Sequence, residues 1–333
     1  MKIVVDAFGG DKAPLEIVKG VVNSVAKYDI EAILTGDKEK LEKLMSDQEL
    51  SNRNIELVDA KEIITMEDDP SLSVKTKKDS SLVVAMRILA ENKADAFVGA
   101  GNTGAVLTAA TLIAKRIKGL KRPALAPILP SMTGSFMLLD CGANVTCKPE
   151  YLYQFAVMGS IYMNKMYGIQ NPKVGLLNNG IEEHKGTELQ IETYKLLKNS
   201  TLNFVGNVEP KELMQGACDV IVTDGFTGNI FLKTLEGASK MFGSMIKDVL
   251  YTNFKTKVGG LLTKREFGEF KRNIDPKEYG GVPLLGISKA VIKAHGNSDA
   301  RAFENAIKQA VDFYNSRMIE IIESDFSNNN LNS

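Results

Sequence analysis

The sequence predicts an α/β protein built on a mostly parallel sheet. Short apolar segments rich in β-branched residues alternate with longer segments of helical periodicity, which is typical of βαβ units. The length of 333 residues exceeds a usual single core and predicts one large α/β unit or two lobes that share a sheet. Strands are expected at 2–6, 31–36, 54–59, 94–99, 135–140, 173–178, 203–207, 219–224 and 289–294. Helices are expected at 15–28, 80–93, 104–117, 150–167, 186–199 and 300–323.

The overall charge is balanced, with 41 basic and 41 acidic residues, and this gives no reason to expect nucleic acid as a partner. The three cysteines have no metal-ligand spacing, so we expect no metal site and a reducing, cytoplasmic environment. No apolar stretch approaches the ~18 residues of a membrane span. We therefore expect a soluble intracellular protein.

The loop after the first expected strand reads DAFGGDKAP. Gly9 and Gly10 permit close approach of another backbone or a ligand, and Pro14 suits the first turn of a helix. In parallel α/β folds, ligands bind beyond the carboxyl ends of the strands. We expect this loop to form one wall of the active cleft, with Asp6 or Asp11 fixing its shape. A purely structural turn is the alternative.

Residues 99–104 read GAGNTG, which matches a dinucleotide-binding fingerprint after a strand and before a helix. The ribose-binding carboxylate expected about 20 residues later is missing, although Lys121 and Arg122 would suit the 2′-phosphate of NADP. The motif also suits phosphate binding by Asn102, Thr103 and Gly104, or tight packing without a ligand. An NADP-linked dehydrogenase is therefore one alternative function.

Three further loops supply polar side chains. The loop TDGFTGN contributes Asp224, Thr227, Gly228 and Asn229, which are typical of helix capping as well as of binding sites. The loop DCGAN contributes Asn144, and the loop NNGIEEHKG contributes Lys185, which could equally be a solvated surface lysine.

The sequence contains no G-x-S-x-G, P-loop or H-E-x-x-H motif. A reaction needs few catalytic acids and bases if its nucleophile is already ionised and its leaving group departs without a proton donor. Phosphate, with a second pKa of roughly 6, and a thiol, with a pKa of about 8.5, meet these conditions. The composition is thus compatible with acyl transfer from a thioester to phosphate.

Seven ordered motifs over nearly the whole chain resemble those of the bacterial phosphate acyltransferases of phospholipid synthesis, the PlsX family: DAFGGDKAP, AGNTGA, RPALAP, DCGAN, GLLNNGIEEHKG, VTDGFTGN and KAHGNSD. The resemblance implies a two-lobed, three-layer α/β/α fold like that of phosphotransacetylases and isopropylmalate dehydrogenases. It implies reversible transfer of a long-chain acyl group from acyl carrier protein to inorganic phosphate, giving acyl phosphate. A homodimer without an organic cofactor and a downstream membrane glycerol-3-phosphate acyltransferase are implied as well.

The resemblance also suggests site residues. The lysine of the family's E-x-x-K-G element falls on Lys185, an expected oxyanion or phosphate partner. The surrounding polar shell is expected to consist of Asn102, Thr103, Asn144, Asp224 and Asn229. Small departures from the family pattern occur at Phe8, Gly99 and Cys141, and Gly99 is the residue that completes the apparent dinucleotide fingerprint.

The segment 236–283 has helical spacing and an apolar stripe, and between 240 and 272 it contains eight basic and three acidic residues. Such a segment suits an anionic membrane surface or an acidic carrier protein, whereas a dimer interface or core is the alternative. We expect peripheral contact with the inner face of the cell membrane through Phe254, Lys257, Leu261 and Leu262. The segment belongs to a single catalytic unit, 1–325, followed by a disordered tail, 326–333. A non-enzymatic scaffold that recruits acyl carrier protein to the membrane is a further alternative function.

Overall fold

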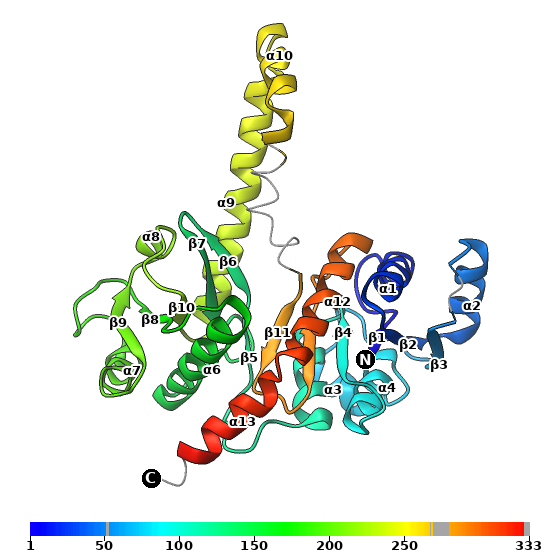
Figure 1. Cartoon of the computed structure of the whole chain (residues 1–333), viewed down its shortest axis with the longest axis horizontal. Coiled ribbons are helices and arrows are strands. Elements are labelled where there is room, and N and C mark those ends of the chain that lie inside the picture. Colours follow the sequence, from blue (N-terminus) through cyan, green and yellow to red (C-terminus); the bar gives the residue numbers. More distant parts are fainter. Residues whose placement is uncertain (51–52, 267, 269–279, 330–333) are drawn as a thin grey trace.

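Two β-sheets form the body of the molecule in a computed structural model that describes residues 1–50, 53–266, 268 and 280–329 (Figure 1). The seven-stranded sheet has the order β3 (Ile55–Asp59), β2 (Glu31–Gly36), β1 (Lys2–Asp6), β4 (Ala96–Gly99), β12 (Ala290–Lys293), β11 (Val282–Leu285) and β5 (Ala124–Leu125). The five-stranded sheet has the order β6 (Ile128–Ser131), β7 (Gly134–Leu139), β10 (Val220–Val222), β8 (Lys173–Leu177) and β9 (Asn203–Val208). Among these described strands, β11 runs antiparallel to both β12 and β5, and β6 runs antiparallel to β7, while the other pairs are parallel. The mostly parallel α/β fold is confirmed, with one sheet in each lobe rather than a shared sheet.

The nine expected strands are present, and the structure adds β5, β6 and β11. Prolines obscured β6 and β11 in the sequence, because a proline lacks the N–H group that a sheet ladder needs and argues against a strand. Strand β5 has only two residues, which is too short to give a pattern. Pro130 lies in β6 and Pro283 lies in β11. Strands β5 and β6 lie close in sequence but in different sheets, so this part of the chain connects the two lobes.

Helices cover both faces of the seven-stranded sheet. Val5 of β1 packs in the apolar cluster that contains residues of α1 (Leu15–Tyr28) and α12 (Ala300–Asn315). Val4 points to the opposite face and packs with α4 (Ser81–Ala90). Strand β1 is therefore buried on both sides, as its uninterrupted apolar sequence predicts.

In the second lobe, α6 (Pro149–Tyr167) packs against β7 and β10 and contacts α7 (Glu188–Lys198). The remaining helices of the body are α2 (Lys38–Asp47), α3 (Pro70–Thr76), α5 (Thr103–Ala109), the π-helical η1 (Ala110–Ala114), α8 (Pro210–Leu213) and α13 (Met318–Asn329).

The structure corrects several expected boundaries. Arg317 adopts a positive φ of 53°, and this divides the expected C-terminal helix into α12 and α13. Helix α13 extends to Asn329 and buries Phe326, so helical structure covers the first part of the segment expected to be a disordered tail. Residues 330–333 lie outside the described part of the chain. Pro14 precedes α1 as its N-cap rather than occupying its first turn.

A helical hairpin projects away from the body (Figure 1). Helix α9 (Gly225–Tyr251) has 27 residues and is therefore about 40 Å long at a rise of roughly 1.5 Å per residue. Helix α10 (Phe254–Leu262) folds back against α9. No helix in the described ranges is sufficiently long and apolar to cross a membrane.

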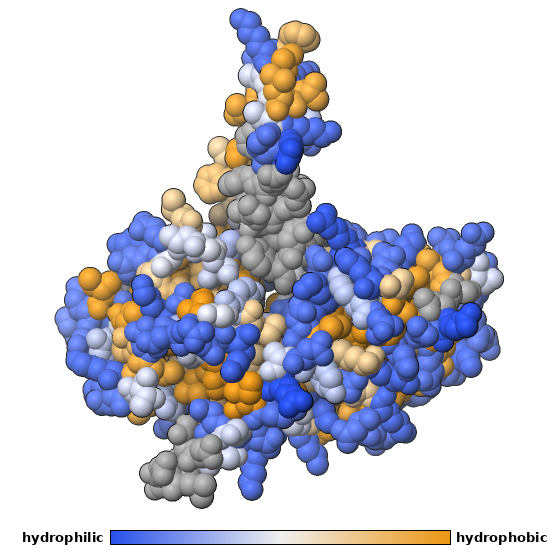
Figure 2. All heavy atoms as spheres, viewed as in Figure 1, coloured by the Kyte–Doolittle hydropathy of each residue, from blue (hydrophilic) through white to orange (hydrophobic). Residues whose placement is uncertain are grey.

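The outer end of this hairpin exposes apolar side chains (Figure 2). Phe254, Leu261 and Leu262 are 81%, 71% and 77% exposed. A role for these three residues in the core of the chain is therefore wrong, whereas contact with another surface stays a prediction. The continuation of the stripe at Phe267 and Phe270, with Glu269, Lys271 and Arg272, lies outside the described residues.

Candidate active site at the strand ends

The loops after β1 and β4 touch through glycines. A Cβ atom on Gly9 would lie 2.8 Å from the backbone nitrogen of Gly101, and one on Gly10 would lie 2.9 Å from the Cβ atom of Ala100. Gly10 also has a positive φ of 112°, and the backbone N–H of Asp11 donates a hydrogen bond to the carbonyl of Gly296 at 2.8 Å. The close backbone approach expected at Gly9 and Gly10 is thus directed toward the neighbouring loops.

Two buried charged residues lie beneath these loops. Asp6 ends β1 and accepts a hydrogen bond from the backbone N–H of Phe8 at 3.2 Å, while burial raises the pKa of its carboxyl group. Lys293 ends β12, and its ammonium group donates to the carbonyl of Ala100 at 3.2 Å and to the carbonyl of Ala294. Burial lowers the pKa of Lys293 to about 8, an effect that the charges of Asp6 and Asp11 oppose.

In the second lobe, Asp140 organises the loop after β7. Its carboxylate accepts hydrogen bonds from the backbone N–H groups of Leu125, Cys141 and Asn144 at 2.9, 2.7 and 2.6 Å. The side-chain amide of Asn144 donates a further bond at 3.0 Å. Because Leu125 belongs to β5 of the other sheet, Asp140 connects the two lobes at their strand ends. Burial raises the pKa of Asp140 to about 6, although these donors favour the ionised form.

The first turn of α9 lies directly against this loop. Asp224 is the N-cap of α9, and its carboxylate accepts bonds from the backbone N–H and the hydroxyl of Thr227, both at 2.8 Å. A Cβ atom on Gly225 would lie 2.6 Å from Oδ2 of Asp140, and one on Gly228 would lie 2.0 Å from the carbonyl oxygen of Asp140. Capping and close packing therefore account for Asp224, Thr227 and Gly228, and a direct binding role for them stays a prediction.

Thr227 and Asn229 are the exposed polar residues of this turn, and the Thr227 hydroxyl is already bonded to Asp224. The Asn229 side chain lies beside Gly142. A Cβ atom added to Gly142 would lie 3.6 Å from Cγ and 3.8 Å from Oδ1 of Asn229. Gly142 adopts a positive φ of 101°, so glycine there serves both the turn and the approach of Asn229. Among the predicted residues of this loop, Asn229 is the one best placed to contact a substrate.

The amides of Asn102 and Asn144 are engaged within the protein. Asn102 caps α5 by accepting from the backbone N–H of Ala105 at 3.2 Å, and its NH₂ group donates to the carbonyl of Met66 at 3.2 Å. Asn144 donates to the carbonyl of Pro123 at 2.7 Å as well as to Asp140. Both side chains fix loops, while Thr103 and Gly104 form the first turn of α5 beside them.

Lys185 lies on the loop that follows β8. Asn178 holds this loop by donating its side-chain amide to the carbonyl of Lys185 at 3.0 Å. Lys185 is exposed on this loop. Strand β8 is parallel to β10, so the Lys185 loop leaves the same sheet edge as the α9 turn.

The thiols of this region are not ionised. Burial raises the pKa of Cys141 and of Cys147 to about 12. The thiol of Cys147 lies 3.5 Å from the carbonyl oxygen of Asn144 and donates a weak hydrogen bond to it. A nucleophilic thiolate is the ionised form, so neither cysteine has the state that attack on an acyl group requires.

Gly228 provides a test of this packing. We expect Gly228→Ala to lower the free energy of unfolding by about 1–3 kcal/mol, because the new methyl group would overlap the Asp140 carbonyl. Urea denaturation measures the change. Gly237→Ala is the control, since a Cβ atom there has no neighbour within 4 Å and alanine favours the helix. Equal stability of Gly228→Ala and the wild type would contradict the packing.

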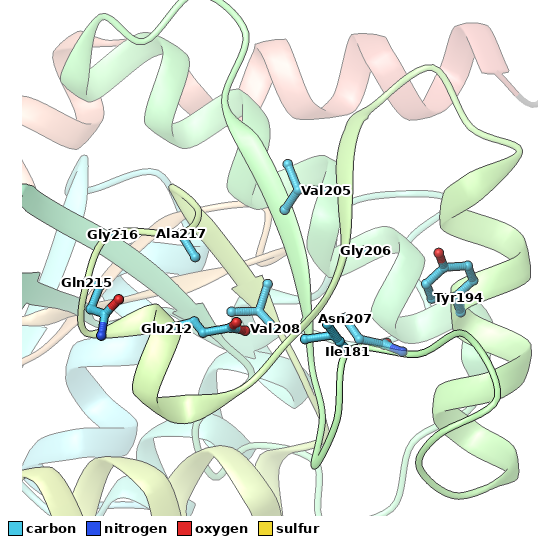
Figure 3. A pocket seen from close by; sticks show the side chains of 10 residues that line it. All are labelled: Ile181, Tyr194, Val205, Gly206, Asn207, Val208, Glu212, Gln215, Gly216 and Ala217. Atoms are coloured by element: carbon cyan, nitrogen blue, oxygen red, sulfur yellow. The ribbon is translucent and has the colours of Figure 1, made fainter.

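A separate open cavity of about 650 Å³ lies on the outer side of the second lobe (Figure 3). Its lining comes from the edge strand β9, from α7, from α8 and its following loop, and from the Lys185 loop through Ile181. None of the predicted site residues lines it. This cavity could not be predicted from the sequence, because its walls are ordinary strand, helix and loop residues.

Sequence reasoning missed Asp140 and Lys293 as site components. The signal for Asp140 was a carboxylate directly after the buried strand SFMLL, before a glycine turn. The signal for Lys293 was a lone lysine inside the apolar run AVIKA, a position where a charge is expensive unless partners compensate it. Both residues fix loops from within.

Comparisons with known proteins assign the family. Residues 1–321 match the model of a family described as fatty acid synthesis protein. A phosphate acyltransferase of Clostridium novyi (strain NT) is 47% identical over 325 residues, which cover 97% of this chain and 98% of the relative. A phosphate acyltransferase of Alkaliphilus oremlandii (strain OhILAs) is 48% identical over 327 residues and 98% of each chain.

Solved structures agree on the fold. A phosphotransacetylase from Streptococcus pyogenes superposes with a TM-score of 0.63 at 16% identity and covers 96% of this chain and 94% of its own. This likeness confirms the phosphotransacetylase-like α/β architecture. The family match and the curated relatives go further, and they show that the chain belongs to the fatty acid synthesis protein family whose relatives are phosphate acyltransferases.

Proposed function

We propose that this phosphate acyltransferase transfers a long-chain fatty acyl group from acyl carrier protein to inorganic phosphate. A phosphate oxygen attacks the thioester carbonyl, the carbon–sulfur bond breaks, and the carrier protein leaves as a thiolate that takes up a proton. The acyl phosphate is the substrate of a membrane glycerol-3-phosphate acyltransferase. The family membership and the names of the relatives support the acyltransferase part of this proposal.

The observation that supports this chemistry best is the set of polar glycine-containing loops at the strand ends, combined with protonated cysteines. Phosphate needs no base to become a nucleophile near neutral pH, and a thiolate needs little help to leave. The protein then has to orient the two substrates and to stabilise the developing oxyanion. Orientation lowers the activation barrier by about 7–11 kcal/mol, and one oxyanion donor lowers it by about 2.7–4 kcal/mol.

We assign roles to the exposed polar groups within this scheme. Lys185 and Asn229 are the donors to the phosphate or to the oxyanion, and Asp224 positions Asn229 by capping its helix turn. Gly9 and Gly10 form the opposite wall together with the turn at Asn102. No cofactor or metal ion has a role in these steps.

Product analysis tests the reaction. Incubation with palmitoyl-acyl carrier protein and inorganic phosphate should give a product that hydroxylamine converts to palmitoyl hydroxamate in proportion to the free thiol. Binding of the carrier protein without any turnover would instead support the scaffold alternative. Tight NADP binding in calorimetry, with no acyl transfer, would support the dehydrogenase alternative.

We also propose that the protein is a cytoplasmic homodimer that associates peripherally with anionic lipid at the inner face of the cell membrane through the α9–α10 hairpin. The exposed apolar side chains at its outer end and the surplus of basic residues, including Lys257, support lipid contact. Membrane association would bring the acyl phosphate to the downstream acyltransferase.

The double change Leu261→Asp and Leu262→Asp should reduce co-sedimentation with vesicles that contain anionic phosphatidylglycerol. Both side chains are exposed, so the circular dichroism spectrum and melting temperature should stay unchanged. Met132→Asp is the matched control, because Met132 is 85% exposed on the hairpin between β6 and β7. Undiminished lipid binding by the folded double variant would contradict the proposal, and light scattering shows whether the hairpin serves the dimer instead.

A further inference from the structure

Lys233 occupies a notable position on α9. It follows Asn229 by four residues, and residues with this spacing lie on the same helix face. Asn229 packs beside Gly142, so this face of α9 is turned toward the loop after β7. The ammonium group of Lys233 forms an ion pair with Glu236 at 2.9 Å, and the Lys233 side chain remains 57% exposed. Lys233 is thus held next to the candidate site yet open to solvent.

The charge of Lys233 affects the pKa of one group in each lobe. On the side of the second lobe, it opposes the effect of burial on the pKa of the Cys141 thiol. On the side of the first lobe, it contributes to lowering the pKa of Lys293 at the end of β12. The first turn of α9 packs against Asp140 through Gly228, and the Asp140 carboxylate accepts a bond from Leu125 of the other sheet, so Lys233 lies about one helical turn beyond the place where the two lobes meet.

The two lysines differ in what surrounds them. Lys293 is buried and donates to the carbonyls of Ala100 and Ala294, and the charges of Asp6 and Asp11 oppose the lowering of its pKa by burial. Lys233 has Glu236 as its carboxylate partner in a pair that water reaches. A divalent anion in contact with Lys233 would be attracted by the charge of its ammonium group. An ammonium group is a common phosphate ligand in proteins.

We propose that Lys233 binds the phosphate substrate beside Asn229, at the place where α9 passes the strand ends of both sheets. This inference rests on the proposed function and adds the phosphate-binding cation to it. Lys293 stabilises the same region from beneath, through the loop at Ala100.

Steady-state kinetics of Lys233→Met test the proposal. One charge-assisted hydrogen bond corresponds to a loss of roughly 10- to 100-fold, so the KM for phosphate should rise by that factor. The KM for palmitoyl-acyl carrier protein should change little. Lys233→Arg should restore most of the phosphate affinity, because arginine keeps the charge. Lys240→Met is the control, since Lys240 is an exposed lysine farther along α9 and should behave as the wild type.

A double variant and a binding measurement distinguish failure of this inference from failure of the proposed function. The double variant Lys233→Met/Glu236→Gln leaves no unpaired Glu236 carboxylate and should show the same rise in KM. Calorimetric titration with inorganic phosphate should show the same loss of affinity without any turnover. Unchanged phosphate affinity in Lys233→Met would overturn this inference while leaving the acyl transfer intact. Phosphate binding that depends on Lys233, in a wild type that fails to turn over, would support this inference and contradict the proposed function.

Discussion

Replacing Lys185 by alanine should lower the turnover number by about 100- to 1,000-fold, the loss typical of one oxyanion-hole donor. Its ammonium group extends from the loop after β8 into solvent, while the loop itself is held by the Asn178 amide bonded to the Lys185 carbonyl. The side chain is therefore free to meet a substrate, and its removal should not disturb the loop. The melting temperature should stay within about 1 °C, as for a surface substitution.

Lys195→Ala is the matched control for this variant. Lys195 belongs to the same lobe, is exposed on α7, and forms an ion pair with Glu192 at 2.7 Å. Turnover in the control should equal that of the wild type, because an exposed ion pair contributes little. A Lys185→Ala enzyme with nearly normal turnover would remove Lys185 from the reaction.

The second large effect concerns stability. Asp140→Asn should lower the free energy of unfolding by about 2–4 kcal/mol at pH 7, because a buried donor without an acceptor costs about 1–3 kcal/mol. The carboxylate accepts four N–H bonds with its two oxygens, whereas an asparagine amide would direct its own NH₂ group at one pair of those donors. Chemical denaturation measures the loss. Asp219→Asn is the control, since Asp219 accepts a single exposed bond from the backbone of Lys173.

The free energy of unfolding should also depend on pH differently in the wild type and in Asp140→Asn. Burial raises the pKa of Asp140 from its ordinary value of 3.8 to about 6, so the folded protein retains this proton in a range where the unfolded chain has lost it. The stability from this proton is complete below the unfolded pKa and declines as the pH rises through the folded pKa. The stability difference between wild type and Asp140→Asn should therefore grow as the pH falls from 6 to 4. A difference independent of pH would contradict the buried-carboxylate assignment.

The sequence predicted the parallel strands and most helices because their apolar periodicity reflects burial. The stretches KIVVD and ADAFV became β1 and β4, each buried on both faces. Strands β6 and β11 escaped prediction because their prolines contradict strand propensity, and β5 escaped because it has only two residues. The division between α12 and α13 also escaped, because Arg317 has no residue-type signal for a positive φ.

The sequence indicated the tight loops at the strand ends, because glycine pairs such as Gly9 and Gly10 mark close backbone approaches. The role of these loops in a site stays a prediction. Sequence could not reveal that the amides of Asn102 and Asn144 are engaged by distant carbonyls, such as those of Met66 and Pro123. Such partners are set by tertiary structure alone.

The most direct test of the account is thiol release from purified palmitoyl-acyl carrier protein, measured with and without inorganic phosphate. Acyl transfer to phosphate predicts that release requires phosphate, saturates with its concentration, and yields one acyl phosphate for each thiol. Release at the same rate without phosphate would contradict the account and indicate hydrolysis of the thioester by water.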